Sequence, residues 1–222
     1  MNLVSVAASS PVPAADARLV DIAALRRELE TSIEGEVRFD AVTRALYSTD
    51  ASVYQIEPLG AVITKSRDDL IRVVRLCAKF RCPLTLRGGG TSQAGQTIGA
   101  GLLVDTSKYY NRILELNTEE CWVRVEPGIV LDELNATLRP HGLRFAPDVS
   151  TASRATNGGM IANNSSGARS VLYGKTIDHV LELEVVLSDG SIAQLAAGLH
   201  PPEGTFEAQC HRTVQYLASE HA

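Results

Sequence analysis

The stretch of sequence that decides the fold runs from Ala61 to Ser92 and reads AVITKSRDDLIRVVRLCAKFRCPLTLRGGGTS. Residues 61–64 form a short, largely β-branched run that is typical of a strand. Apolar residues then recur every three or four positions from 70 to 77, which predicts an amphipathic helix. Pro83 stops that helix, and residues 84–86 predict a second strand. Strand, helix and strand in this order make a βαβ unit, so the two strands are expected to be parallel.

A glycine-rich loop comes directly after the second strand. Three glycines at 88–90 stand between Arg87 on one side and Thr91 and Ser92 on the other. Glycine permits positive φ and lets backbone N–H groups crowd around an anion. The arginine and the hydroxyls add donors suited to phosphate oxygens. A plain tight turn is the alternative, but ligands of open sheets bind at the carboxyl ends of parallel strands. The loop is therefore predicted to bind phosphate.

Two nucleotide-binding motifs resemble this loop only in part. Residues 90–97 read GTSQAGQT, with Gln96 where a P-loop has the lysine that reaches the terminal phosphates. A P-loop also opens a helix, whereas Gly99 and Gly101 interrupt the residues after this motif. The dinucleotide fingerprint G-x-G-x-x-G fails as well, because position 93 is Gln93. These departures disfavour a nucleotide hydrolase.

A second segment, residues 156–167, reads TNGGMIANNSSG. It is rich in small residues, amides and hydroxyls, and Met160, Ile161 and Ala162 are its expected buried anchors. A mobile surface loop is the alternative that its Ser and Asn content supports. We expect instead that it packs against a flat or charged ligand and exposes its backbone amides to it. Two donor-rich loops suit a dinucleotide cofactor better than a single phosphate.

The remaining elements are predicted from periodicity and turn residues. Ser66 and Asp69 resemble a capping box at the start of the helix described above. Stretch 147–173 has no lasting period. The other expected elements are a helical stretch at 17–46, strands at 102–105 and 122–126, a helix at 131–138 closed by Pro140 and Gly142, a hairpin of 180–187 and 192–195 around Asp189-Gly190, and a helical tail after Pro201-Pro202.

Composition excludes several classes of protein. Hydrophobic residues make up 45% of the 222 positions and charged residues 21%, as in an ordinary globular protein. The net charge of −5 disfavours a nucleic-acid partner. No apolar run reaches the roughly 20 residues that span a bilayer, and residues 1–15 lack a secretory signal pattern. The four cysteines form no CxxC pair, and the five histidines lie at no metal-ligand spacing. We expect a cytoplasmic protein without a metal site, its thiols packed as small hydrophobes.

The order of the motifs closely resembles the FAD-binding domain of the vanillyl-alcohol oxidase/p-cresol methylhydroxylase (PCMH) type. Within it the D-lactate dehydrogenase and glycolate oxidase flavin-subunit branch is most similar, including bacterial proteins that fuse this domain to an iron–sulfur part. The resemblance spans about residues 40 to 195 and rests on both loops together with the motifs Val125–Gly128, Ala146–Asp148, Tyr173-Gly174 and Glu184–Gly190. It implies an α+β fold of two subdomains, a small βαβ lobe and a larger, mainly antiparallel lobe, with FAD extended between them.

The resemblance also implies the site residues. The pyrophosphate loop would be Arg87, Gly88, Gly89, Gly90, Thr91 and Ser92. The wall and the ribityl–pyrophosphate region would be formed by Pro127, Gly128, Asp148 and Thr156. The cofactor lining would be Gly158, Gly159, Ala162, Asn164, Ser166 and Gly167, with Val186 at the adenine end. The implied organisation is a flexible tail at 1–16, a helical segment at 17–56, the FAD-binding domain at 57–196, and a tail at 197–222 leading to a substrate domain outside the chain.

The implied activity is oxidation of a 2-hydroxy acid such as D-lactate or glycolate by hydride transfer to FAD. Electrons would leave to an iron–sulfur domain or subunit, a quinone or a cytochrome. Thr91 stands where some relatives carry a histidine that links the flavin, so the FAD is expected to be non-covalent. No catalytic residue is assigned, because in this family a following domain supplies the substrate side. The alternatives are an enolpyruvyl-sugar reductase and a non-catalytic flavin-binding fragment or subunit that needs a partner. A Gly89→Val protein is expected to fold without binding FAD.

Overall fold

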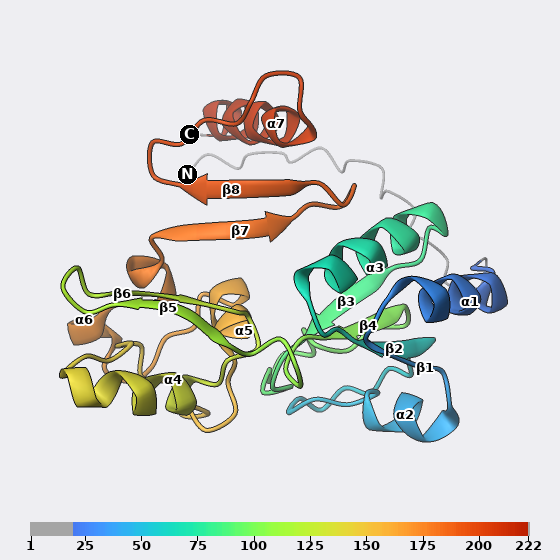
Figure 1. Ribbon diagram of the computed structural model, residues 1–222, viewed down its shortest axis with the longest axis horizontal. Coiled ribbons are helices and arrows are strands. Elements are labelled where there is room, and N and C mark those ends of the chain that lie inside the picture. The colour runs from blue at the N-terminus through green and yellow to red at the C-terminus, as the bar shows by residue number, and fades with distance from the viewer. Residues whose placement is uncertain (1–19, 222) are drawn as a thin grey trace, which may run out of the picture.

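The computed structural model describes residues 20–221, so the tail predicted at 1–16 lies outside the described residues. Figure 1 shows two lobes side by side, with a hairpin and the last helix above them. The first lobe is built from the helices α1 (Ile22–Ser32), α2 (Ala41–Leu46) and α3 (Arg67–Lys79), and from the strands β1 (Glu36–Arg38), β2 (Gly60–Ile63), β3 (Leu84–Arg87) and β4 (Leu102–Asp105).

The four strands of the first lobe form one sheet in the order β1-β2-β4-β3. Both β2 and β3 run parallel to β4, which confirms that the two strands of the predicted βαβ unit are parallel. They are not neighbours, because β4 lies between them. Leu102, Leu103 and Val104 of β4 are fully buried, so the most apolar strand occupies the centre of the sheet.

The helical segment predicted at 17–56 is interrupted by a strand. β1 separates α1 from α2 and pairs with β2 in antiparallel fashion, and residues 47–56 form turns. Gly35 marks the break, because a Cβ there would lie 2.3 Å from the carbonyl oxygen of Ile63. The chain therefore leaves the helical pattern where it has to pass closely along β2.

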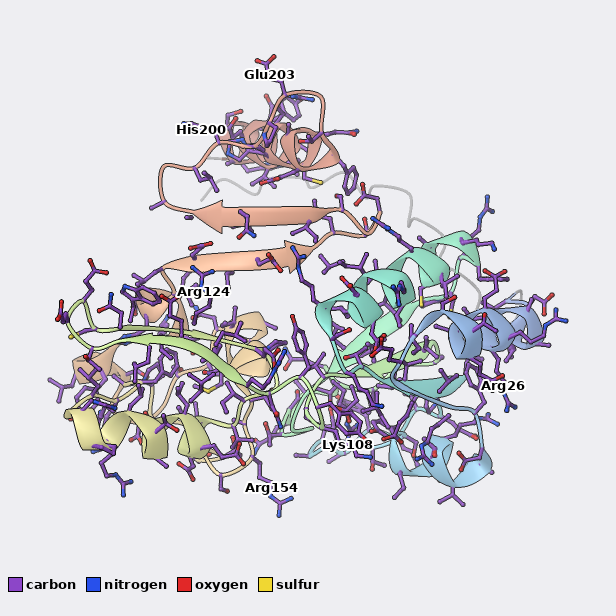
Figure 2. The ribbon with its side chains drawn as sticks, viewed as in Figure 1. Arg26, Lys108, Arg124, Arg154, His200 and Glu203 are labelled. Carbon is purple, nitrogen blue, oxygen red and sulfur yellow. The ribbon has the colours of Figure 1, made fainter. Side chains whose placement is uncertain are left out.

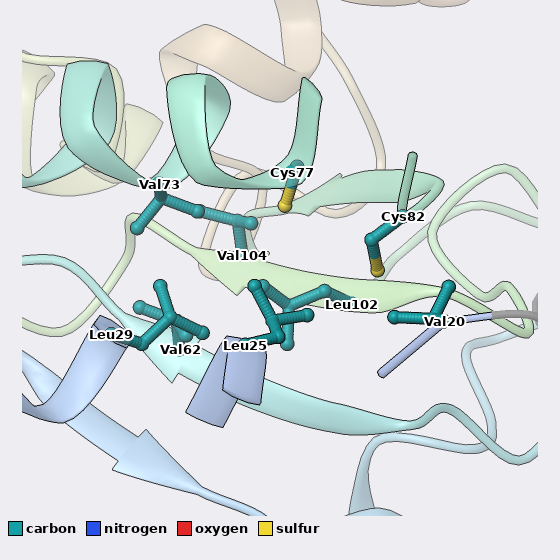
Figure 3. Packing of buried hydrophobic residues seen from close by; sticks show 9 residues of the cluster. All are labelled: Val20, Leu25, Leu29, Val62, Val73, Cys77, Cys82, Leu102 and Val104. Carbon is teal, nitrogen blue, oxygen red and sulfur yellow. The ribbon is translucent and has the colours of Figure 1, made fainter. Parts of the chain in front are cut away.

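The core of the first lobe lies between α1, α3 and the sheet (Figure 3). Leu25 and Leu29 of α1 meet Val73 of α3 over the strands. Cys77 and Cys82 are buried in the same cluster, as expected for thiols that pack as small hydrophobes. The expectation is wrong for Cys121, which is exposed in a turn, and Cys210 is half-buried. Full burial of a Leu or Val side chain contributes about 1.5–3 kcal/mol, so this cluster accounts for much of the stability of the lobe.

The second lobe has its own buried clusters. Its elements are β5 (Ile113–Asn117), β6 (Trp122–Val125), α4 (Leu131–Leu138), the 3-10 helix η2 (Arg139–His141), α5 (Asn157–Ala162), α6 (Ser170–Tyr173) and η3 (Thr176–His179). Leu134 and Leu138 of α4 pack under the β5–β6 hairpin. The stretch predicted to lack regular structure, 147–173, contains the short helices α5 and α6. Thr156 caps α5, because its Oγ1 accepts from the amide of Gly159 at 3.4 Å.

The hairpin of β7 (Glu182–Val186) and β8 (Ile192–Ala196) is antiparallel, as predicted, and α7 (Phe206–Glu220) comes after it. Glu184 of β7 accepts from Arg67 of α3 at 3.0 Å. Glu182 of β7 lies 3.4 Å from Arg124 of β6, so the hairpin touches both lobes (Figures 1 and 2). None of the helices within residues 20–221 has the length and apolar character needed to cross a membrane.

Candidate functional site

The glycine-rich loop between β3 and β4 carries consecutive backbone amides that the protein leaves unpaired. Within residues 20–221, the amides from Gly88 to Gln93 donate to no protein acceptor. Gly89 is exposed, and Gly88 and Gly90 are half-buried. The loop leads into the strand β4 and opens no helix, which agrees with rejection of the P-loop. Successive amides with free N–H groups make a concavity that suits an anion.

The two predicted loops lie against each other. A Cβ on Gly88 would be 2.1 Å from Oγ1 of Thr156, and one on Gly89 would be 2.1 Å from the carbonyl oxygen of Arg154. Arg154 itself projects from the side of the molecule opposite the β7–β8 hairpin (Figure 2). These glycines are therefore required by contact with protein backbone and side chain. That Gly89→Val folds stays a prediction, and the close approach to Arg154 indicates that the valine would destabilise the folded protein.

The second segment differs from its expected form. The amide of Asn157 donates to the carbonyl of Ile129 at 2.9 Å, and that of Gly158 donates to the carbonyl of Pro127 at 2.8 Å. The amides of Met160, Asn163, Asn164 and Ser165 also donate to carbonyls within the segment. The prediction that this segment exposes its amides to a ligand is wrong, since α5 and its flanking turns use nearly all of them. Met160 is buried as expected, but Ile161 is half-buried and Ala162 is exposed, so the expectation of three buried anchors holds for Met160 alone. Ala162, Asn164 and Ser166 are exposed and can still line a ligand with their side chains.

Pro127 and Gly128 follow β6 and pack against two different segments, α5 and the turn after β4. A Cβ on Gly128, which is buried, would lie 2.2 Å from the carbonyl oxygen of Thr106. A Cβ on Gly158 would lie 2.6 Å from Cβ of Pro127. The wall that the sequence predicts is thus in direct contact with the first turn of α5.

Asp148 lies beside Gly167, where a Cβ would come 1.6 Å from the carbonyl oxygen of Asp148. A hydrogen bond from Arg169 at 2.6 Å lowers the pKa of the Asp148 carboxyl below its usual value. Asn164 has a positive φ of 44° and accepts through Oδ1 from the amide of Ile177 at 3.0 Å. These side chains hold the turns between α5 and η3, in addition to any contact that they make with a ligand.

Val186 is the one predicted residue that lies apart from the two loops. It pairs with Ile192 inside the β7–β8 hairpin. Side chains join this hairpin to α3, through Arg67 to Glu184 and Arg75 to the carbonyl of Gly190, and to β6, through Arg124 to Glu182. The assignment of Val186 to the adenine end stays a prediction.

Sequence reasoning missed the residues that connect the loops to each other and to the N-terminal segment. Gln96 accepts from Oγ of Ser92 at 2.8 Å and donates to Oδ1 of Asn163 at 3.0 Å, so it bridges the two loops. An amide side chain can both donate and accept, which explains why Gln serves here. Arg87 donates to the carbonyl of Thr49 at 2.7 Å. The polar run YSTDAS at 47–52 falls in the segment predicted to be helical, and no local pattern in it indicates this tertiary contact.

The described residues offer no obvious centre for proton transfer. His179 is bonded through Nε2 to the carbonyl of Tyr173 at 2.7 Å and packs edge-on against Phe145, a structural role. His141 ends a 3-10 helix and is exposed. Within residues 20–221, no group of three His, Cys, Asp or Glu side chains could hold a metal ion. Nothing here adds a catalytic residue to the assignment.

The donor set fits an extended cofactor with two phosphates. Free amides at Gly88–Gln93 suit pyrophosphate oxygens, and hydroxyls and small residues lie on the facing segment. Asn157 is only 3% exposed and leaves its side-chain Nδ2 without a partner, so a further donor is unused beside Thr156. The fold and this site define a two-lobe domain for a dinucleotide cofactor.

Comparison with known proteins identifies the cofactor. A family model described as FAD binding domain matches residues 58–196, and the chain belongs to this family. Its cofactor is therefore FAD. The two-lobe α+β fold also occurs in an alkyldihydroxyacetonephosphate synthase, with a TM-score of 0.72 and 21% identity, over 82% of this chain and 36% of that one. A carbohydrate oxidase from Microdochium nivale gives a TM-score of 0.68 at 20% identity, over 78% and 37%. These structures confirm the predicted fold class.

Two curated relatives are similar in sequence. D-2-hydroxyglutarate dehydrogenase of Pseudomonas putida is 50% identical over 163 residues, which are 72% of this chain and 16% of that protein. Glycolate oxidase subunit GlcD of Bacillus subtilis is 34% identical over 177 residues, 78% of this chain and 38% of that protein. The chain thus spans well under half of either relative.

Proposed function

We propose that this chain binds FAD without a covalent bond and that its parent activity is oxidation of a 2-hydroxy acid. The observation that carries the proposal is the row of unpaired amides at Gly88–Gln93, packed against Thr156 in a domain of the FAD-binding family. These amides would hold the pyrophosphate together with Thr91 and Ser92. Bound FAD would accept hydride from the α-carbon of the substrate, while the residues described here bind and orient it.

The remaining assignments support the same arrangement. Pro127 contacts α5, Thr156 contacts the glycine-rich loop, and Gly128 packs against the turn after β4, so these residues could form a wall beside a ribityl–pyrophosphate chain. Gly158, Gly159, Ala162, Asn164, Ser166 and Gly167 would line the cofactor with small or polar side chains, Asp148 would hold the turn behind them, and Val186 would reach the adenine end.

The substrate class rests on the names of the relatives. They are named for D-2-hydroxyglutarate, glycolate and, at 32% identity in Kluyveromyces lactis, D-lactate. The first relative, at 50% identity, favours D-2-hydroxyglutarate over the smaller acids. We also propose that electrons leave the flavin to an iron–sulfur domain or subunit, a quinone or a cytochrome. The proposed location is the cytoplasm.

Titration with FAD followed by hydrogen–deuterium exchange tests the binding site. Amides 88–93 have no protein acceptor, so they should exchange rapidly without FAD and slowly with it. Amides 157–165 are already bonded within the protein and should change little. Acid precipitation should release all of the flavin. If amides 88–93 exchange at the same rate in the free and the FAD-bound protein, the pyrophosphate binds elsewhere.

Activity is tested separately. The FAD-loaded protein is mixed with D-2-hydroxyglutarate, D-lactate or glycolate and an artificial electron acceptor, and absorbance of the oxidised flavin is followed without oxygen. Loss of that absorbance with one of the acids supports the oxidoreductase. Stable FAD binding with no response to any acid favours the alternative, a flavin-binding fragment or subunit that needs a partner domain.

A further inference from the structure

We propose that residues 47–54, which precede the family match at 58–196, hold the glycine-rich loop in its binding conformation, with Tyr47 and Asp50 as positioning residues. This inference rests on the proposed binding of FAD pyrophosphate at that loop. It assigns a role in cofactor affinity to residues that neither the glycine motifs nor the facing segment contains. We call residues 47–54 the clamp segment.

The clamp segment forms hydrogen bonds to the start of the loop through its own backbone amide and carbonyl groups. The amide of Ala51 donates to the carbonyl of Gly90 at 3.1 Å. Arg87 donates to the carbonyl of Thr49 at 2.7 Å, and its guanidinium lies 5.3 Å from the centre of the Tyr47 ring. Gly90 has a positive φ of 64°, and a Cβ there would lie 2.6 Å from Nη2 of Arg87. Arg87 thus fills the space beneath the turn of the loop.

Tyr47 is in turn fixed to the central strand of the sheet. Its hydroxyl donates to Oδ2 of Asp105, at the end of β4, at 2.6 Å. Asp105 is 7% exposed, and its other oxygen accepts from the amide and the hydroxyl of Ser107 at 2.7 Å each. Burial and this hydrogen bond raise the pKa of Tyr47, so the hydroxyl keeps its proton. The ring under Arg87 therefore has a fixed position.

The clamp segment also forms a hydrogen bond near the end of the loop, at Thr97. Oδ2 of Asp50 accepts from the hydroxyl of Thr97 at 3.0 Å, and Oδ1 accepts from the amide of Ser52 at 2.9 Å. Burial by itself would raise the pKa of Asp50, but these hydrogen bonds from Ser52 and Thr97 lower it below the usual value. Gly95 has a positive φ of 73°, and a Cβ there would lie 2.9 Å from the Tyr54 ring.

The unpaired amides make the loop dependent on support from outside. Hydrogen bonds within the loop run from Ser92 to residues 94–96, and the amides at 88–93 donate to none of its acceptors. The turn at Gly88–Gly90 therefore depends on contacts from other segments for its shape. The clamp segment supplies bonds at Gly90, Arg87 and Thr97, so the amides are preorganised for an anion. Preorganisation raises affinity because less conformational entropy is lost on binding.

The test uses the full 222-residue chain with Tyr47→Phe and Asp50→Asn. Matched controls remove the same chemistry elsewhere in the lobe. Tyr109→Phe loses a phenol bonded to the carboxylate of Glu36. Asp40→Asn alters a carboxylate that accepts from the amide and hydroxyl of Thr43. FAD affinity is measured by quenching of flavin fluorescence, and hydrogen–deuterium exchange is recorded on every FAD-saturated protein.

We expect Tyr47→Phe and Asp50→Asn to weaken FAD binding about tenfold or more, the effect of losing one charge-assisted hydrogen bond. Protection of amides 88–93 should fall in both variants, while β2 and β4 exchange as in the wild type. The controls should bind FAD within about twofold of wild type, since exposed bonds contribute little.

Wild-type affinity in a folded Asp50→Asn protein would overturn the inference, even if Tyr47→Phe does not fold. Loss of protection throughout the first lobe would also overturn it, because the role would then be general stability. A wild-type chain that binds no FAD is a different result, and it would remove the proposed function itself.

Discussion

A methyl group on Gly88 or Gly89 would lie 2.1 Å from Oγ1 of Thr156 or from the carbonyl oxygen of Arg154, respectively. At these two positions glycine is needed for close packing within the protein as well as for access of a ligand to the backbone. Gly159 belongs to the facing segment, and a Cβ there would meet only Oγ1 of Thr156, at 3.3 Å. A side chain is therefore excluded at Gly88 and Gly89 but tolerated at Gly159, although the sequence alone does not distinguish these glycines.

Gly89→Ala is therefore expected to destabilise the flavin-free protein by about 1–3 kcal/mol, as overpacking does. The melting temperature of the transition in which the first lobe unfolds should fall by several degrees. Gly159→Ala is the matched control, and it should be neutral or stabilise by up to about 1 kcal/mol, because it replaces a glycine within α5. Calorimetry without FAD measures both. Equal melting temperatures for the two variants would contradict the packing argument.

Glu36 provides a pH-dependent link at the edge of the sheet. Hydrogen bonds from Lys108, Tyr109 and Arg38 lower its pKa to about 2. A lowered folded-state pKa means that the stabilisation is complete above the ordinary glutamate pKa of 4.5 and is lost as the pH falls toward 2. Stability should thus fall between pH 5 and pH 2, and Glu36→Gln should reduce that fall. Urea unfolding of the wild type and of Glu36→Gln at pH 7 and pH 3 measures the free energy of unfolding. If the free energy falls equally in both proteins between these pH values, Glu36 does not contribute.

At the scale of elements, Asp69 joins three pieces of the first lobe. It is fully buried at the start of α3, and its carboxylate accepts from the amides of Glu34 and Lys65 at 2.9 Å each. Ser66 caps the helix by accepting from the amide of Asp69 at 3.2 Å, which is half of the predicted capping box. The other half is absent, because the carboxylate of Asp69 turns to residues before the helix.

Asp69→Ala should consequently destabilise the protein by about 1–3 kcal/mol, because it leaves two amides without acceptors. Asp68→Ala is the control, since Asp68 is its exposed neighbour in the same turn, and it should change stability by less than about 0.5 kcal/mol. Equilibrium unfolding in urea compares the two. Similar effects at 68 and 69 would show that helix charge near the N-terminus, rather than the link between elements, is responsible.

The elements also differ in how well sequence predicts them. α3 and the strands around it are predictable from local periodicity, because their apolar residues face one core. β1 and α5 are not, since β1 exists through pairing with β2 and α5 through capping by Thr156 and bonds to Pro127 and Ile129. The glycine loop could be located from its residues, but the clamp segment could not, because its contacts with the loop are tertiary.

At the scale of the whole molecule, the two lobes have separate buried cores. In the described part of the chain, the cluster around Leu25 and Val62 does not overlap with those around Leu134 and Met160. The lobes meet through loops at Gly88–Thr156 and Gly128–Thr106, and the β7–β8 hairpin adds exposed ion pairs to each. Exposed pairs contribute less than about 1 kcal/mol each, so the flavin-free lobes are weakly coupled.

FAD held between the lobes should join them into one cooperative unit. A ligand that binds only the folded state, at a concentration of 100 times its Kd, stabilises the folded state by about 2.7 kcal/mol. If the ligand contacts both lobes, unfolding of either lobe loses this stabilisation. Calorimetry should show two transitions without FAD and one, at higher temperature, at saturation. Asp50→Asn should need about ten times more FAD to merge the transitions, since its loop is less well positioned. If FAD raises only the transition of the first lobe, the second lobe does not contact the cofactor, and the residues from Asp148 to Gly167 must be removed from the site.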